Sequence, residues 1–189
     1  MSTAIIRPTG YAYQEGVTSP EKAYDNDTST KITTADKNYP RIVFTDFDMS
    51  EIPDNISKIN NIRICVYGRP ASVSSMSVRA VYNADSNGGY TDCGDGSVEM
   101  PWKSGLNDYK VSMPQAVNYW NNNLSDFING GFQMRFYYID DADAVYEAYA
   151  EIDYDSPVVD TSNVYCGTKK VSVYCGTKKL STYCGTKLI

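Results

Sequence analysis

Histidine is absent from the 189-residue sequence. Without an imidazole, the chain cannot build the usual serine or cysteine catalytic triads, a histidine-ligated zinc site or a histidine pH switch. A glycine-rich phosphate loop, a nucleophile elbow and a Cys-x-x-Cys pair are missing as well. We therefore expect a protein that is not an enzyme, with no catalytic residue and no bound cofactor. A small glycosidase that uses two carboxylates is the least favoured hypothesis.

Long apolar runs are also missing, since no stretch of about 18 apolar residues occurs. Residues 1–6 are too short for the apolar core of a signal peptide, and the odd number of cysteines, five, fits synthesis in a reducing cytoplasm. The net charge of -6 and a pI near 4.6 argue against nonspecific binding of nucleic acid. Nucleic acid and membrane are therefore not expected as partners.

The charge is distributed unevenly along the chain. Residues 164–189 hold five of the 17 basic residues and no acid, which leaves 12 basic and 23 acidic residues, a net charge of -11, in residues 1–163. An acidic domain with a basic end can associate with copies of itself. The alternative is that both charged regions are simply solvated surfaces that keep the protein in solution.

The basic end is a repeat of nine residues. Its three copies read VYCGTKKVS, VYCGTKKLS and TYCGTKLI, and chance does not produce such identity. Alternating β-prone residues before each Gly-Thr-Lys predict short strands and tight turns, either as a small β-meander or as coils of a β-solenoid. Such short strands bury little surface, so the repeat needs a partner surface, on its own chain or on another subunit. The candidate assembly residues are Tyr165, Tyr174, Tyr183, Lys169, Lys170, Lys178 and Lys179.

The rest of the chain has the pattern of an antiparallel β-sandwich. Strands are expected at residues 41–47, 59–67, 76–82, 131–138 and 144–154. One helix is expected at residues 114–128, where apolar residues follow helical spacing before an Asn-Gly stop. The predicted fold class is all-β: a jelly-roll sandwich over residues 1–158 with one short helix, a linker at 159–163, and the small β-repeat at 164–189.

Alternation assigns the faces of two strands. Ile62, Ile64 and Val66 should share one face of their strand. In residues 144–154, Val145, Glu147 and the alternate residues that follow should form a wet, charged face.

Three stretches resemble galactose-binding-like jelly-roll modules in virion proteins of phages of Gram-positive bacteria. They are RPTGYAY with AYDNDTSTKITT (residues 7–13 and 23–34), residues 42–70 ending in Tyr-Gly-Arg-Pro, and residues 124–157. The C-terminal repeat is similar to the YxGTxx end repeats of phage structural proteins. The resemblance implies a multicopy virion protein, whose partners are other virion proteins and copies of itself.

Two sets of residues are candidates for binding. Asp25, Asn26 and Asp27 are similar to an acidic first loop that holds structural calcium in related modules, and they offer oxygen ligands, whereas a simple Asx turn is the alternative. Tyr90, Trp102 and Tyr109 lie in an irregular stretch and offer flat apolar faces to a sugar or a partner. No motif for sugar binding matches well enough to transfer residues from the family.

The sequence therefore predicts a virion structural protein of the capsid-decoration or head-fibre type, with the repeat mediating subunit contact or attachment. The alternative is a tail or baseplate adhesin, a carbohydrate-binding module that recognises host cell-wall glycans. The expected location in both cases is the virion, after assembly in the host cytoplasm.

Overall fold

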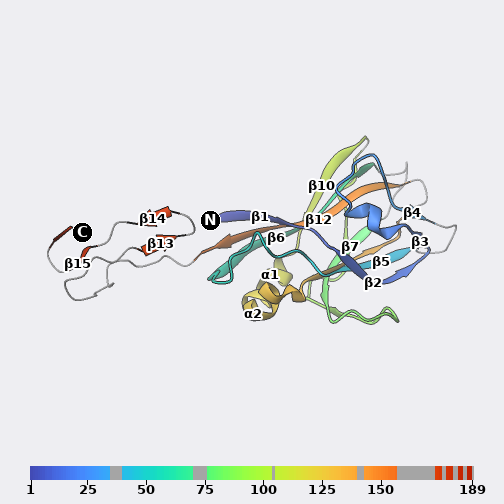
Figure 1. The fold of residues 1–189 in the computed structure, drawn as a ribbon. Helices are drawn as coiled ribbons and strands as arrows, with labels where there is room; N and C mark the ends of the chain where they lie inside the picture. Colours follow the sequence, from blue (N-terminus) through green and yellow to red (C-terminus); the bar gives the residue numbers. More distant parts are fainter. Residues whose placement is uncertain are drawn as a thin grey trace. The chain divides into compact units, whose positions relative to one another are not determined.

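The computed structural model describes residues 1–34, 40–69, 76–103, 105–139 and 143–156, together with the backbone of four short strands near the C-terminus (Figure 1). The chain divides into two compact units, Met1–Ser156 and Pro157–Ile189. We call the first unit the body and the second the tail.

The body is a sandwich of two antiparallel β-sheets, which confirms the predicted all-β fold class. The four-stranded sheet has the order β1 (Ser2–Ile6), β12 (Ala144–Asp155), β6 (Lys58–Arg69), β10 (Asn107–Ser112). The six-stranded sheet has the order β2 (Gly10–Glu15), β5 (Arg41–Thr45), β11 (Gln133–Tyr137), β7 (Ser77–Tyr82), β8 (Thr91–Asp92), and β9 (Val98–Glu99) also pairs with β7. A separate pair consists of β3 (Val17–Thr18) and β4 (Thr33–Thr34), and a 3-10 turn, η1, covers Pro20–Ala23. All five predicted strands are present.

The core lies between the two sheets. Ile62, Ile64 and Val66 face it from β6, as their alternation predicts, because successive side chains of a strand point to opposite faces. From the other sheet, Phe44 and Phe136 meet edge to face with ring centroids 5.3 Å apart. Burial of such side chains is the main stabilising contribution to the fold.

The predicted face assignment of β12 is wrong at its beginning. A β-bulge interrupts the register between Val145 and Glu147, so Val145 joins the core instead of sharing a face with Glu147. The charged face is also not wet: the Glu147 side chain is 5% exposed, and Tyr149 and Asp153 are buried too. On this face Arg63 pairs with Glu151 and Asp153.

The single predicted helix is broken. The chain forms α1 (Pro114–Asn121), a short α2 (Leu124–Asp126) and a π-helical turn, η2 (Phe127–Gly131). At the break, Asn122 and Asn123 donate their side-chain amides to the carbonyl oxygens of Asn118 (3.0 Å) and Tyr119 (2.8 Å). Asparagine competes in this way with the helical backbone pattern, and the spacing of apolar residues alone does not predict this competition.

The described part of the tail consists of two hairpins. β13 (Val173–Cys175) pairs antiparallel with β14 (Lys178–Leu180), and β15 (Tyr183–Cys184) pairs antiparallel with β16 (Lys187–Leu188). Two residues, Gly-Thr, separate the strands of each hairpin, which is the commonest hairpin spacing. Antiparallel pairing of consecutive strands fits the meander alternative rather than a solenoid. The side chains of the seven candidate assembly residues lie outside the described part of the structure.

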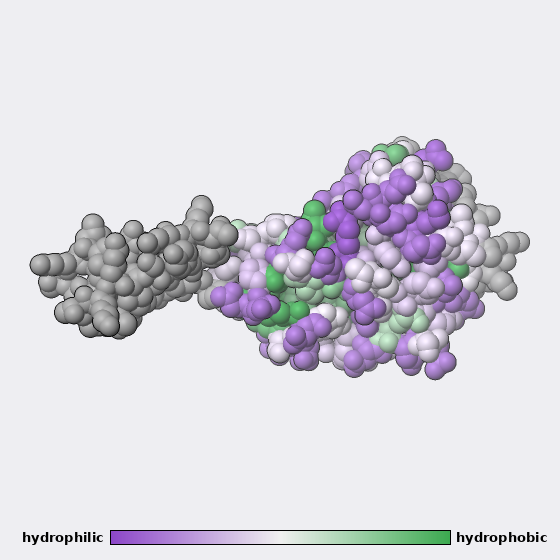
Figure 2. Space-filling model, in the orientation of Figure 1, coloured by the Kyte–Doolittle hydropathy of each residue, from purple (hydrophilic) through white to green (hydrophobic). Residues whose placement is uncertain are grey.

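Figure 2 shows several hydrophobic residues close together on the lower left of the visible face of the body, and others that lie separately. The large hydrophobic residues that are exposed are Met1, Ile5, Tyr11, Leu106 and Tyr138. Among the described residues, no helix has the length and apolar character needed to cross a membrane.

Candidate functional site

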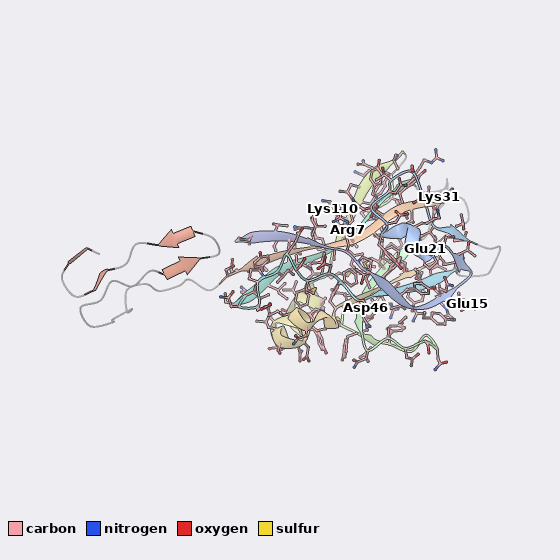
Figure 3. All side chains as sticks on the ribbon, in the orientation of Figure 1. Arg7, Glu15, Glu21, Lys31, Asp46 and Lys110 are labelled. Carbon is pink, nitrogen blue, oxygen red and sulfur yellow. The ribbon has the colours of Figure 1, made fainter. Side chains whose placement is uncertain are left out.

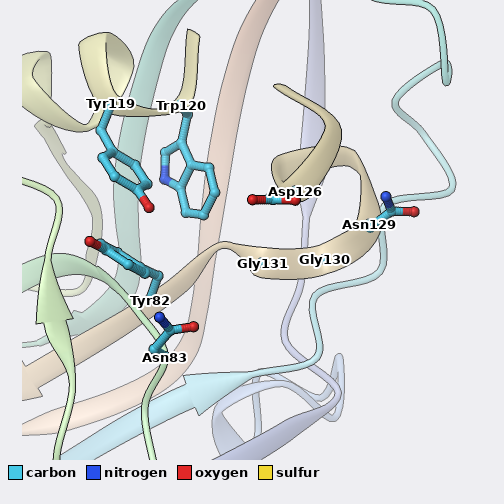
Figure 4. Close-up of a pocket in the computed structure, with 8 residues that line it drawn as sticks. All are labelled: Tyr82, Asn83, Tyr119, Trp120, Asp126, Asn129, Gly130 and Gly131. Carbon is cyan, nitrogen blue, oxygen red and sulfur yellow. The ribbon is translucent and has the colours of Figure 1, made fainter. Parts of the chain in front are cut away.

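A cleft of about 350 Å³ opens in the body where the end of β7 meets α1 and the η2 turn (Figure 4). Its lining residues come from segments that are distant in the sequence. They are Tyr82, Asn83, Tyr119, Trp120, Asp126, Asn129, Gly130 and Gly131.

Aromatic rings form one wall of the cleft. Tyr82 and Tyr119 stack with centroids 4.5 Å apart and an interplanar angle of 20°, and Trp120 lies edge-on to Tyr119 at 4.8 Å. The Trp120 side chain is only 1% exposed, so it supports this wall while the two half-buried tyrosines present it. Burial, followed by hydrogen bonding to Tyr82, raises the pKa of Tyr119.

Polar side chains border the aromatic wall. In Figure 4, Asp126 is directed toward Trp120, whereas Asn129 points away across the turn; the Asn129 amide donates to the Ser125 carbonyl at 2.9 Å. A Cβ atom on Gly131 would lie 2.8 Å from the Asp126 carbonyl oxygen and 3.2 Å from the Trp120 ring. Glycine at position 131 therefore allows the turn to pack closely against the aromatic wall.

Two anchors fix α1 and hence the aromatic wall. The helix has no side-chain cap from Met113, but Asp95 of a distant loop accepts hydrogen bonds from the backbone N–H groups of Gln115 (2.9 Å) and Ala116 (2.7 Å). At the other end, the Asn121 side chain exchanges two 2.8 Å hydrogen bonds with the backbone of Ile59 on β6. A carboxylate at a helix N-terminus satisfies free N–H groups and complements the helix dipole. The cleft is thus built on a rigid support.

The structure brings two of the three predicted aromatic contact residues together, Trp102 and Tyr109, and none of the three is among the residues that line the cleft. Trp102 and Tyr109 pack edge to face, 4.6 Å apart, and the buried Tyr109 hydroxyl contacts the Gly105 carbonyl oxygen at 2.8 Å. Tyr90 lies on the outer surface of the other sheet, against Arg79 and Arg135. Helical spacing of apolar residues predicts the helix but not the cleft, because only the folded chain brings Tyr82 next to α1.

Hydrogen bonds within the loop occupy the candidate calcium ligands. Asp25 accepts from the Asp27 N–H (2.9 Å) and the Thr30 hydroxyl (2.7 Å), and Asp27 accepts from the Ser29 N–H (2.9 Å). These are Asx-turn contacts. Within the described ranges, no three Cys, Asp or Glu side chains converge closely enough to hold a metal ion.

Glu147 lies near this loop without a hydrogen-bond partner. It is buried, and neither carboxylate oxygen has a partner among the described residues, although the Asn26 N–H approaches it. Burial raises the pKa of Glu147, and Asp25 and Asp27 raise it further against the opposing effect of Arg7. A buried carboxylate is costly unless it is protonated or a nearby cation neutralises it, and Arg7 is such a cation.

No family model and no curated protein matches the sequence. Among solved structures, the chain is similar to the enzymatically active domain of bacteriophage CBA120 tailspike protein 4, with a TM-score of 0.30 and 10% sequence identity. The match covers 82% of this chain and 19% of that one.

Proposed function

We propose that this chain is a non-enzymatic phage virion protein whose body binds a glycan in the cleft beside α1. The observation that carries the proposal is the combination in one cleft of a stacked tyrosine wall with amide and carboxylate groups. Sugars are bound in this way, because their C–H faces pack on aromatic rings while their hydroxyls need donors and acceptors. The virion assignment rests on the sequence resemblance.

The cleft favours the adhesin hypothesis over capsid decoration, because a coating subunit needs no ligand site. It also argues against glycoside hydrolysis. Asp126 is the one carboxylate among the lining residues, whereas glycosidases generally use two. The cleft therefore suits recognition of a host cell-wall glycan without its cleavage.

A glycan array followed by calorimetric titration tests the proposal. We expect saturable binding that Tyr119→Ala weakens at least tenfold, because the substitution removes half of the stacked wall. Tyr11→Ala is the matched control, since Tyr11 is an exposed tyrosine on β2 that does not line the cleft. Binding that Tyr119→Ala leaves unchanged, or product formation during the titration, contradicts the proposal.

We further propose that the tail mediates contact between subunits or attachment to the particle. Two short hairpins are marginal by themselves, so they need a partner surface. Truncation after Asp160 should convert an oligomer into a soluble monomer, as measured by light scattering. If the truncated protein keeps its oligomeric state, the tail does not drive assembly.

A further inference from the structure

We propose that the cleft selects uncharged sugars and rejects acidic ones, and that Asp126 causes the rejection. This inference rests on the proposed function and names the class of ligand for the same site. It follows from the charge of the lining, the hydrogen-bonding groups and the placement of the arginines in the body.

The charge of the lining is negative. Asp126 is the one acidic side chain among the eight lining residues, and neither lysine nor arginine is among them. Figure 4 shows its carboxylate directed toward Trp120 and not away from the cleft. A uronic acid, sulfate or phosphate group bound here would face a like charge without a cation to neutralise it.

The other polar groups of the lining are uncharged. Asn83, Tyr82 and Tyr119 offer amide and hydroxyl groups. A carboxylate accepts hydrogen bonds from two neighbouring donors. Asp126 is therefore suited to a pair of adjacent sugar hydroxyls, which a neutral hexose supplies.

Three arginines that could attract an acidic sugar form ion pairs or ring contacts outside the cleft. Arg63 pairs with Glu151 and Asp153, and Arg79 pairs with Asp92. Arg135 is 2% exposed and lies between the rings of Tyr90 and Tyr137. None of these guanidinium groups lines the cleft, so they provide no site for an anionic substituent of a bound sugar.

Matched pairs of saccharides test the inference. Calorimetric titration of the full chain would compare glucose with glucuronate and galactose with galacturonate, and would include oligosaccharides of each sugar. We expect at least one neutral member to bind tenfold or more tightly than its acidic counterpart. Asp126→Asn should reduce this ratio toward one by improving binding of the acid, and Asp126→Lys should reverse the preference.

Asp54→Asn is the matched control, because it changes the net charge equally at an exposed position that does not line the cleft. A melting curve of each variant establishes that it is folded. If the acidic sugars bind as tightly as the neutral ones, or if Asp126→Asn leaves the ratio unchanged, the inference fails while the proposed function stands. If no saccharide of either class binds, the proposed function fails and takes the inference with it.

Discussion

The two outer faces of the sandwich hold buried charge by different means. On the outer face of the four-stranded sheet, Arg63 forms ion pairs of 2.9 Å with both Glu151 and Asp153. Lys110, labelled in Figure 3, reaches Glu151 from β10. We call these four residues the ion-pair cluster. Each positive charge in it has a carboxylate partner.

The outer face of the six-stranded sheet carries arginines against tyrosines. The guanidinium carbon of Arg135 lies 4.2 Å from the ring centroid of Tyr90 and 4.1 Å from that of Tyr137. Its Nη1 donates to the Gly88 carbonyl at 3.3 Å, and no described carboxylate pairs with it. We call Arg135, Tyr90 and Tyr137 the arginine–tyrosine cluster. Burial lowers the pKa of Arg135, with a further contribution from nearby Arg41 and Arg79.

The difference concerns what remains when the cation is removed. Loss of Arg63 leaves two partly buried carboxylates, and one of them, Asp153, then has no ion-pair partner among the described residues. Loss of Arg135 leaves two aromatic rings, which carry no charge. An orphaned buried charge costs more than a lost cation–π contact. The ion-pair cluster should therefore be the more fragile of the two.

Replacement of each arginine by methionine tests this comparison most strongly. Arg63→Met should lower the free energy of unfolding by about 2–3 kcal/mol, since the charges left behind are only partly exposed. Arg135→Met should cost about 1 kcal/mol or less, because methionine keeps an apolar contact between the rings and removes a desolvated charge. Urea unfolding of both variants measures the difference. Equal losses, or a larger loss for Arg135→Met, contradict the comparison.

Acid should affect the ion-pair cluster selectively. Burial alone would raise the pKa of Glu151, but hydrogen bonds from Lys110 and Arg63 outweigh this effect and lower the pKa. Burial likewise opposes ionisation of Asp153, and hydrogen bonds from Arg63 and Thr3 outweigh it and lower the pKa of Asp153. Carboxylates with a lowered folded-state pKa stabilise the fold above their unfolded pKa of about 4, and this contribution is lost as pH falls. The difference in unfolding free energy between wild type and Arg63→Met should therefore be smaller at pH 3 than at pH 7. The gap for Arg135→Met should not change.

Alkali should affect the arginine–tyrosine cluster. Burial, and then the 2.7 Å hydrogen bond to Tyr90, raises the pKa of Tyr137 to about 12. The unfolded tyrosine ionises near pH 10, so this contribution to stability is complete below pH 10 and is lost as pH rises toward 12. Tyr137→Phe should therefore show a shallower loss of stability over that range than wild type. An unchanged slope would show that Tyr137 does not titrate in this way.

Local pattern predicted much of this architecture, but not the contacts that distinguish its parts. Alternation placed Ile62, Ile64 and Val66 toward the core, because a half-buried strand must repeat every two residues. This alternation does not predict the bulge after Val145, since nothing in the local pattern marks the extra residue. The cleft needs Tyr82 and Tyr119 to meet across the fold, and such pairing is a tertiary property that periodicity does not contain.

The smallest predicted effects concern the partly exposed cations of the two faces. Removing such a cation should lower the free energy of unfolding equally on both faces. The Lys110 side chain is 37% exposed and that of Arg41, which pairs with Glu15, is 38% exposed. Exposed ion pairs contribute about 0.5 kcal/mol, because water screens them and the side chains lose freedom. Removal of Lys110 also leaves Glu151 paired with Arg63. Lys110→Met and Arg41→Met should therefore each cost about 0.5 kcal/mol in urea unfolding, with 0.5 M salt reducing both losses. A large loss from Lys110→Met alone would mean that the whole ion-pair cluster behaves as one unit, and that its fragility does not depend on Arg63 alone.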